Sequence, residues 1–419
     1  MAYTVTTSSG NSTLVGTSAA DQIAAAGTAS RTIKVNAFEG LDTLTIDAAV
    51  SSGTVGMGGG VDAVTISAAA ENVAVTLGDA ADTFAASAAA DGITVGGQGG
   101  ADTFTFTAAV LNSRFAGGQG IDTFVNTTGD LGTKTTIVGG SENDVIGTST
   151  ARFQTGANAF FNGQKGADSI FLDGFAGMTV HGGSEADTIN NNTDVDAAFL
   201  SGDNGADTIT DGIGDNTLTG GGGSDTITAG AGADTLIGGL GADDFVMSDV
   251  VTAAAGITVD TINDFTVADD QVGNYGVADL ETLTVVTDLV EAGDATSVAA
   301  ANFEATVTKV TGSYDLGTTG TGSILALGSS TAFTTATLQT AIRSGGTLEL
   351  TAGAAFAAAD GFIVFYDDNV DSYAAVVTTA GGVADNAVSG DFVVTNLTKF
   401  DGLADATTIT TANLLAFTA

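Results

Sequence analysis

The sequence predicts an all-β protein, in which a long parallel β-roll or β-helix is followed by a β-rich C-terminal domain. The chain of 419 residues contains 60 Gly and no Pro, which favours periodic turns. Twelve Asp residues recur at intervals of 18 to 24 positions between Asp21 and Asp243. Ten of them open short alternating stretches such as Asp102-Thr-Phe-Thr-Phe, and such alternation is typical of strands with one buried face.

The charge of the chain is almost entirely negative. Asp and Glu total 49 and Lys and Arg nine, so the formal net charge is −40. A hydrophobic content of 43% and a mean hydropathy of +0.31 nevertheless predict a folded chain, because acidic disordered segments lack apolar surface. A field this negative repels phosphate, so we expect neither nucleic acid nor an anionic membrane as a partner. Divalent cations are the natural counter-charge.

The beginning of the chain lacks the basic and apolar regions of a cleaved signal peptide. No run of 18 uncharged apolar residues occurs, so we expect no membrane insertion. The absence of Cys excludes disulfides and zinc–thiolate sites. We therefore expect a protein that stays inside a cell or is exported by a route that does not read its N-terminus.

Each repeated Asp follows a Gly-rich turn, so one strand, a turn, a return strand and a second turn make a coil of about 20 residues. From Gly202 to Val246 the period tightens into five consecutive nonapeptides. With 18 residues per coil, alternate nonapeptides face opposite edges. We expect the earlier coils to keep Asp on one edge and to close the other with plain turns. The sixth positions of the nonapeptides are Asp207, Asn216, Asp225, Asp234 and Asp243.

Three segments match the pattern G-G-x-G-x-D-x-U-x in full: Gly117–Val125, Gly220–Thr228 and Gly238–Val246. Over roughly residues 16 to 246 the chain resembles the RTX (repeats-in-toxin) family, whose nonapeptides build a calcium-binding parallel β-roll. The resemblance implies several Ca²⁺ ions held between successive turns, where Gly turns carbonyls inward and Asp supplies charge. The expected ligand residues are Asp102, Asp122, Asp144, Asp168, Asp187, Asp207, Asp225, Asp234, Asp243, Gly117, Gly220, Gly222 and Gly238, with Asp264 or Asp260 closing the terminal site.

Some turns depart from the family pattern. The turns before Asp42, Asp82 and Asp144 lack one or more Gly. The alternative for every repeated Asp is a polar turn residue that satisfies backbone N–H groups without metal. The sequence leaves open whether residues 21–82 bind calcium.

We expect the roll to occupy residues 1–250, with an N-terminal cap, and a capping, assembly and secretion domain to occupy 251–419. Segments 323–327, 361–366 and 391–395 are expected as antiparallel strands, and 336–343 as a short helix. Phe362–Tyr373 is expected as a hairpin around an acidic turn, where a polar turn is favoured over a calcium half-loop because no Gly follows.

The final third is similar to the C-terminal domain of bluetail-type bacterial surface proteins. Its last ten residues fit a type I secretion signal, or an ordinary last strand.

No enzyme is expected. The lone His181 excludes an H-E-x-x-H site, no G-x-S-x-G is present, and the nine cationic residues are scattered. The sequence favours a secreted, calcium-binding structural protein that self-assembles into a bacterial surface layer, coat or filament, with cell-surface polysaccharide as a further partner. The alternatives are a viral or extracellular fibre component, an adhesin and an RTX polysaccharide-active enzyme. An adhesin would need aromatic platforms, but the chain has no Trp and no Tyr within the repeats.

Overall fold

The computed structural model describes most of the first 273 residues and shorter parts of the remainder. The described residues are 12–17, 19–24, 32–127, 131–154, 156–173, 177–191, 197–247, 259–273, 307–310, 314–315, 324–327, 338, 350–351, 361–368, 370–379, 392–404 and 408–409. The chain forms two compact units. Unit 1 contains residues 1–216 and 220–222, and unit 2 contains 217–219 and 223–419. The expected domain boundary at residue 250 divides the chain differently and stays a prediction.

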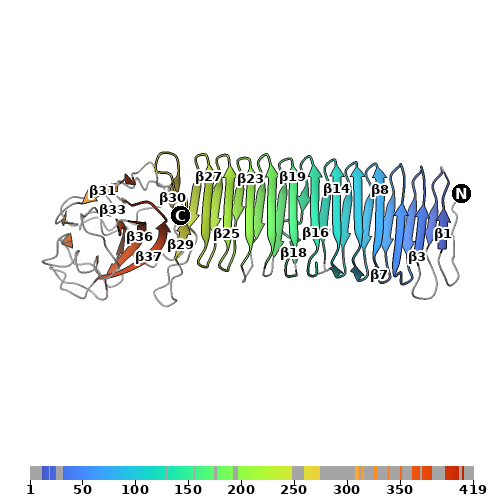
Figure 1. Cartoon of the computed structure of the whole chain (residues 1–419), viewed down its shortest axis with the longest axis horizontal. Helices are drawn as coiled ribbons and strands as arrows, with labels where there is room; N and C mark the ends of the chain where they lie inside the picture. The colour runs from blue at the N-terminus through green and yellow to red at the C-terminus, as the bar shows by residue number, and fades with distance from the viewer. Residues whose placement is uncertain are drawn as a thin grey trace, which may run out of the picture. The chain divides into compact units, whose positions relative to one another are not determined.

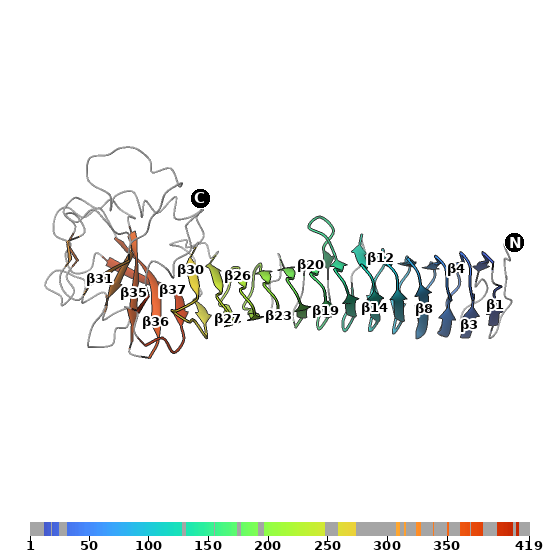
Figure 2. The same cartoon turned by 90° about the horizontal axis from the view of Figure 1, so that it is seen from above.

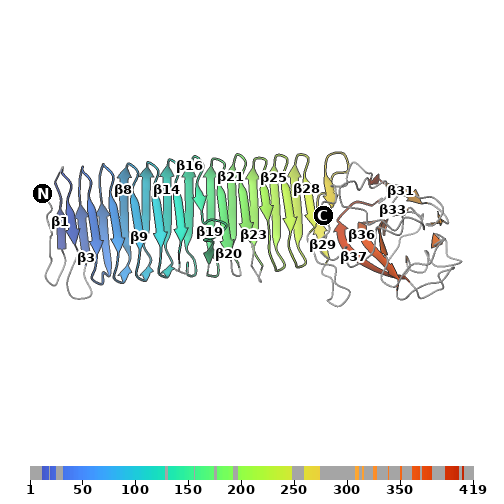
Figure 3. The same ribbon diagram turned by 180° about the vertical axis from the view of Figure 1, so that it is seen from behind.

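Unit 1 is a stack of parallel coils, which confirms the predicted β-roll. Figure 1 shows one layer of strands, Figure 2 separates the two layers from above, and Figure 3 shows the opposite side. The first layer, sheet A, contains β1 (Ser12–Val15), β3 (Thr32–Asn36), β5 (Ser52–Gly56), β8 (Val73–Asp79), β11 (Thr94–Gly99), β14 (Arg114–Gln119), β16 (Thr136–Ser141), β19 (Phe160–Lys165), β21 (Thr179–Ser184) and β23 (Phe199–Asn204).

The second layer, sheet B, is also parallel. It contains β2 (Gln22–Ala24), β4 (Thr43–Ile46), β6 (Ala63–Ile66), β9 (Thr83–Ala86), β12 (Thr103–Phe106), β15 (Thr123–Asn126), β17 (Val145–Ile146), β20 (Ser169–Asp173), β22 (Thr188–Asn191) and β24 (Thr208–Thr210), with β18 (Phe153–Gln154) paired to β20. A third, short sheet joins β7 (Ala70–Glu71), β10 (Ala90–Asp91) and β13 (Val110–Leu111).

The core of unit 1 lies between the sheets. Because side chains alternate along a strand, β12 buries Phe104 and Phe106 and turns Thr103 and Thr105 outward. The parallel register places equivalent residues of successive coils together, and the rings of Phe104 and Phe124 stack with centroids 4.5 Å apart. The predicted alternating stretches are therefore strands with one buried face.

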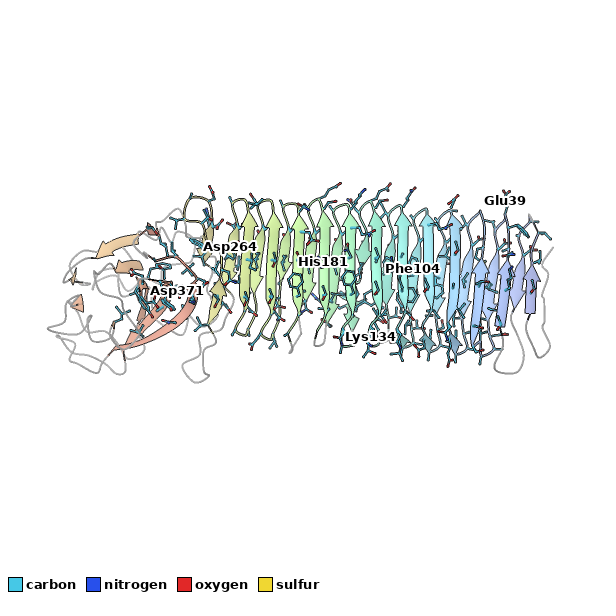
Figure 4. The ribbon with its side chains drawn as sticks, in the orientation of Figure 1. Glu39, Phe104, Lys134, His181, Asp264 and Asp371 are labelled. Carbon is cyan, nitrogen blue, oxygen red and sulfur yellow. The ribbon has the colours of Figure 1, made fainter. Side chains whose placement is uncertain are left out.

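One edge of unit 1 is closed by turns that use left-handed backbone conformations. Asn72 (φ 51°), Asn112 (φ 47°) and Asn158 (φ 62°) occupy this conformation, which Asn tolerates better than most residues. Lys134, with φ of 61°, belongs to the same series and lies at the edge opposite Glu39 in Figure 4. This edge agrees with the plain turns expected for the 20-residue coils.

Unit 2 begins with further coils. Its strands are β25 (Thr217–Gly222, of which 220–222 belong to unit 1), β26 (Thr226–Ala229), β27 (Thr235–Leu240), β28 (Asp244–Met247), β29 (Asp260–Ile262) and β30 (Gln271–Gly273). The pairs β26–β28, β27–β29 and β28–β30 are parallel. The coil pattern thus continues to residue 273.

The remaining strands of unit 2 form a mixed arrangement. They are β31 (Val307–Val310), β32 (Tyr314–Asp315), β33 (Ile324–Leu327), β34 (Leu350–Thr351), β35 (Gly361–Asp367), β36 (Ser372–Thr379) and β37 (Phe392–Phe400). The predicted hairpin is confirmed, since β35 and β36 are antiparallel, as are β36 and β37. In addition, β37 pairs in parallel with β29 of the last coil.

The antiparallel direction predicted for 323–327 is wrong. Strand β33 pairs in parallel with both β31 and β35. Alternation of side chains indicates a strand but not its direction, and the segments 311–323 and 328–360 are long enough for parallel crossovers.

Of the expected helix 336–343 only the buried Leu338 is described, and the last ten residues lie outside the described part. No helix among the described residues is long and apolar enough to cross a membrane.

Candidate metal sites

The repeated Asp residues of unit 1 form a continuous series of hydrogen bonds, which we call the Asp ladder. The backbone N–H of each Asp donates to Oδ1 of the Asp one coil later, at 2.6 to 2.8 Å, and all the carboxylates are buried. The ladder runs through Asp21, Asp42, Asp62, Asp82, Asp102, Asp122, Asp144, Asp168, Asp187 and Asp207.

The second oxygen of most ladder carboxylates is buried without a hydrogen-bond partner among the described residues. A buried charge without a partner is costly, so each of these atoms needs a proton or a cation. The atoms are Oδ2 of Asp42, Asp62, Asp82, Asp102, Asp122, Asp144, Asp168 and Asp187 in unit 1, and of Asp243 in unit 2.

Beside these atoms, oxygens of two successive coils converge on the Gly that lies five residues before the Asp. A Cβ added to Gly97 would lie 1.9 Å from Oδ2 of Asp102 and 2.4 Å from the carbonyl oxygen of Gly117, one coil later. A Cβ on Gly117 would lie 2.0 Å from Oδ2 of Asp122 and 2.6 Å from the carbonyl oxygen of Gly139. We call this space, lined by a carboxylate and a carbonyl, a cradle.

The cradle recurs along the ladder. The same pair of oxygens lies at 2.1 to 2.9 Å from the Cβ position of three further glycines, which are Gly139, Gly163 and Gly182. Carboxylate and carbonyl oxygens are the ligands that Ca²⁺ takes in proteins. No group of three or more His, Asp or Glu side chains converges among the described residues. The residues therefore fit a calcium site that uses one or two carboxylates and completes its coordination with backbone oxygens.

Burial raises the pKa of the ladder carboxyls, even though the N–H bond to Oδ1 opposes the shift. The pKa of Asp102 and Asp122 rises to about 7, and that of Asp144 and Asp187 to about 8. The charge of neighbouring ladder carboxylates adds to the rise at Asp144, next to Asp122 and Asp168. The calcium-free ladder therefore disfavours its own full ionisation, and a bound cation would relieve that cost.

In unit 2 the Asp residues lie in two rows. Asp225 donates its backbone N–H to Oδ1 of Asp243 at 2.9 Å, and Asp243 donates in turn to Asp270 at 3.0 Å. In the other row, the N–H of Asp234 donates to Oδ1 of Asp260 at 2.9 Å. Alternate nonapeptides thus contribute to different rows, as the 18-residue period predicts.

Asn216 occupies a sixth position and accepts a backbone N–H from the previous coil as the Asp residues do, but its amide nitrogen makes an additional contact. Its Oδ1 accepts the N–H of Ala198 at 2.6 Å, and its Nδ2 donates to Oδ2 of Asp211 at 2.5 Å. Asp211 is buried and also accepts from Nδ2 of Asn191. The amide therefore holds a neighbouring carboxylate at this position.

The expected ligand residues are placed as follows. Asp102, Asp122, Asp144, Asp168, Asp187 and Asp207 lie in the Asp ladder, Asp225 and Asp243 in one row of unit 2, and Asp234 in the other. Gly117 lines a cradle, and a Cβ on Gly238 would lie 2.5 Å from Oδ2 of Asp243. The carbonyl of Gly222 accepts the N–H of Gly205, and Gly220 lies in β25.

Asp264 does not end the row of Asp243. Its two oxygens accept the N–H groups of Gly238 and Gly239, at 2.9 and 2.8 Å. Among the described residues this row continues from Asp243 to Asp270, whose Oδ2 accepts the N–H of Thr266. Sequence reasoning missed Asp270 because it follows Asp243 by 27 residues, although the strand Gln271–Gly273 after it was a usable signal.

The acidic hairpin in the C-terminal part makes the contacts of a polar turn. Oδ1 of Asp368 accepts the N–H groups of Val370 and Asp371, and Oδ1 of Asp371 accepts the N–H of Gly402. Burial alone would raise the pKa of Asp371, but the Gly402 N–H and the ammonium of Lys399, 2.9 Å from Oδ2, lower it. These contacts agree with the polar turn that the sequence favours, and Asn369, between Asp368 and Val370, lies outside the described residues.

A comparison with protein families agrees with this geometry. The model of the RTX calcium-binding nonapeptide repeat (4 copies) matches residues 201–236 and 210–245. No curated protein matches the chain. The matched segment contains Asp207, Asp225, Asp234 and Asp243, and it forms parallel coils whose rows of Asp the 18-residue period predicts. Residues 201–245 are therefore RTX calcium-binding nonapeptide repeats, and the parallel coils of this protein form a β-roll of the RTX type.

Proposed function

We propose that this protein is a secreted, calcium-binding structural protein that assembles with its own copies into a bacterial surface layer, coat or filament. The observation that carries the proposal is the extent of the scaffold. Coils with buried Asp rows occupy the described residues from Ser12 to Gly273. A chain that devotes this much of its length to calcium-type coils is suited to building a rigid structure.

The distribution of charge supports self-assembly. The outward positions of β4, β6, β9, β12 and β15 on sheet B carry no charged side chain, although the net charge of the chain is −40. These positions are Thr43, Thr45, Ala63, Thr65, Thr83, Ala85, Thr103, Thr105, Thr123 and Val125. Copies of a chain with this charge repel one another at low calcium. Cations on the ladder would reduce that repulsion and leave an uncharged face for contact.

The environment of the single histidine supports a role without catalysis. Nδ1 of His181 lies 3.0 Å from Oδ2 of Asp203, and the ring lies between Phe160 and Phe199, with both centroids at 5.7 Å. Figure 4 shows His181 on the strands of the roll. Packing between the two Phe rings and pairing with Asp203, on the outside of sheet A, account for the presence of His181 without a catalytic role.

Export and location follow from the same proposal. Proteins with RTX repeats are typically secreted by the type I route, and the same route is proposed for this chain. The proposed location is the cell surface or the extracellular space. Cell-surface polysaccharide is the proposed attachment partner there, and the C-terminal part supplies capping and secretion.

Analytical ultracentrifugation across a calcium series tests the proposal. We expect monomers with chelator, large species at millimolar calcium and high protein concentration, and a return to monomers when the chelator is restored. A sharp monomer at millimolar calcium and high protein concentration would contradict self-assembly. Electron microscopy of the same samples distinguishes a sheet or filament from disordered aggregate.

A further inference from the structure

The turns that precede the ladder Asp residues do not all have the same residue type at one equivalent position. We call the residue five positions before each ladder Asp the first turn position. It is Gly in six consecutive coils from Gly97 to Gly202, namely Gly97, Gly117, Gly139, Gly163, Gly182 and Gly202. In the three coils before them it is Ala37, Met57 or Leu77, and each of these side chains is 0% exposed.

A side chain at this position occupies the cradle. In the coils with Gly, the point where a Cβ would lie is 1.9 to 2.4 Å from Oδ2 of the ladder Asp. Such a distance is far shorter than a non-bonded carbon–oxygen contact allows. A Cβ therefore cannot be added there unless the carboxylate oxygen moves away. In the coils of Asp42, Asp62 and Asp82 a carbon atom is attached at the equivalent point. In these three coils the side chain of Ala37, Met57 or Leu77 therefore occupies the position at which the later coils bring two oxygen ligands together.

The first coil lacks the site for a different reason. Its first turn position is Gly16, but Oδ2 of Asp21 accepts the N–H of Thr17 at 2.5 Å and lies 3.2 Å from the Thr17 hydroxyl. The oxygen that the later coils leave to a cation is thus already bound by the protein. Oδ2 of Asp42, Asp62 and Asp82 has no such partner among the described residues, so what distinguishes these coils is the side chain at the first turn position.

The same N-terminal coils have other sources of stability. Met57 and Leu77 add buried apolar side chains at the turn, where later coils have Gly. A third row of buried apolar residues is hydrogen-bonded from coil to coil beside the two main sheets; it includes Val50 and Ala70 in these coils and continues to Ala90 and Val110 in the next ones. Burial of hydrocarbon and backbone pairing, rather than a metal, would hold these coils together.

We propose that the calcium row of unit 1 begins at Gly97, and that the coils of Asp42, Asp62 and Asp82 bind no calcium and fold without it. This inference rests on the proposed calcium-binding function and adds a division within the roll. The metal-independent segment, residues 32–86, provides a folded end on which the calcium-dependent coils stack as the cation concentration rises. In Figure 1 it includes β3 and β8, and the calcium-dependent coils include β14, β16 and β19.

Hydrogen exchange of the full chain, read by mass spectrometry, tests the division. In chelator we expect peptides within 32–86 to stay protected, while peptides within 103–191 exchange at least about 100-fold faster than with calcium. Loss of protection in 32–86 together with the rest would overturn the inference and leave the calcium-binding function standing. Exchange that does not respond to calcium in any segment would overturn both.

Two matched variants provide a second test by counting bound calcium in equilibrium dialysis. Asn keeps the Oδ1 acceptor of the ladder and removes the charge, so Asp62→Asn and Asp122→Asn preserve the same hydrogen bonds. We expect Asp122→Asn to lose bound calcium and Asp62→Asn to keep the count of the unsubstituted protein. An equal loss in the two variants would contradict a row that begins at Gly97.

Discussion

The backbone N–H of Asp102 donates a 2.7 Å hydrogen bond to Oδ1 of Asp122, which lies one coil later. The same carboxylate leaves its Oδ2 buried and without a hydrogen-bond partner among the described residues, beside the carbonyl of the coil after it. One side chain thus joins two coils with one oxygen and presents the other to a cation. Because the stacking of coils and the cradle use the same residue, we expect calcium binding and folding to be coupled.

The first prediction concerns the space at the first turn position. Gly117→Ala places a Cβ 2.0 Å from Oδ2 of Asp122, so we expect weaker calcium binding and a loss of about 1–3 kcal/mol of stability from overpacking. Calcium titration followed by circular dichroism measures both. Gly96→Ala is the matched control, because a Cβ there meets nothing within 4 Å. Equal effects of the two substitutions would show that the cradle is not the cause.

The second prediction compares two carboxylates of different rows. Asp243→Asn removes a charge whose Oδ2 has no hydrogen-bond partner among the described residues, and Asp21→Asn removes one that Thr17 already binds. We expect Asp243→Asn to lower calcium affinity about tenfold or more, which is about 1.4 kcal/mol, and Asp21→Asn to change it little. Isothermal titration calorimetry measures the difference. A larger loss of calcium affinity in Asp21→Asn than in Asp243→Asn would contradict the assignment of Asp243 as a calcium ligand and of Asp21 as a polar turn residue.

The third prediction concerns the amide at the sixth position of a nonapeptide. Asn216→Asp replaces the donor to Oδ2 of Asp211 with a second carboxylate in a buried position. We expect the calcium-free protein to lose about 1–3 kcal/mol of stability through the lost hydrogen bond and like-charge repulsion. Urea unfolding in chelator measures the loss, with Asn204→Asp at the exposed end of β23 as control. A neutral effect of Asn216→Asp would mean that the contact with Asp211 does not stabilise the coil.

The fourth prediction is a pH dependence of the calcium-free protein. Burial raises the pKa of Asp102 and Asp122 to about 7 and of Asp144 and Asp187 to about 8, from the ordinary value of 3.8 for an Asp carboxyl. Between pH 3.8 and about 8 the folded state therefore binds more protons than the unfolded state, so stability falls as the pH rises through this window. We expect a higher Tm in chelator at pH 5 than at pH 8. Calcium should add more to the Tm at pH 8, because it binds the ionised carboxylate, and a Tm in chelator that rises with pH would contradict this account.

Much of the fold could be predicted from spacing alone. The interval between Asp102 and Asp122 gives the length of a coil, and the alternation of Thr103 to Phe106 gives the buried face of the strand. The direction of β33 could not be predicted, because direction depends on the connecting segments and not on alternation.

The positions of the repeated Asp residues could be predicted from the sequence, but the contacts that these residues make could not. Spacing places Asp102 and Asp122 at one edge, but it does not reveal that a backbone N–H joins them. The role of Asp264 was missed because a carboxylate near Gly residues fits either a cation or backbone N–H donors, and only the geometry shows the N–H groups of Gly238 and Gly239. The contrast between Met57 and Gly97 was visible in the sequence, but its meaning depends on where a Cβ would lie.

Anomalous diffraction from crystals grown in calcium would locate the bound ions. We expect anomalous peaks in the cradles beside Gly97, Gly117, Gly139, Gly163 and Gly182, each within bonding distance of Oδ2 of the ladder Asp and of a carbonyl oxygen from the next coil. Cradles without anomalous density at saturating calcium, with the Oδ2 atoms bound instead to protein donors or water, would contradict this expectation.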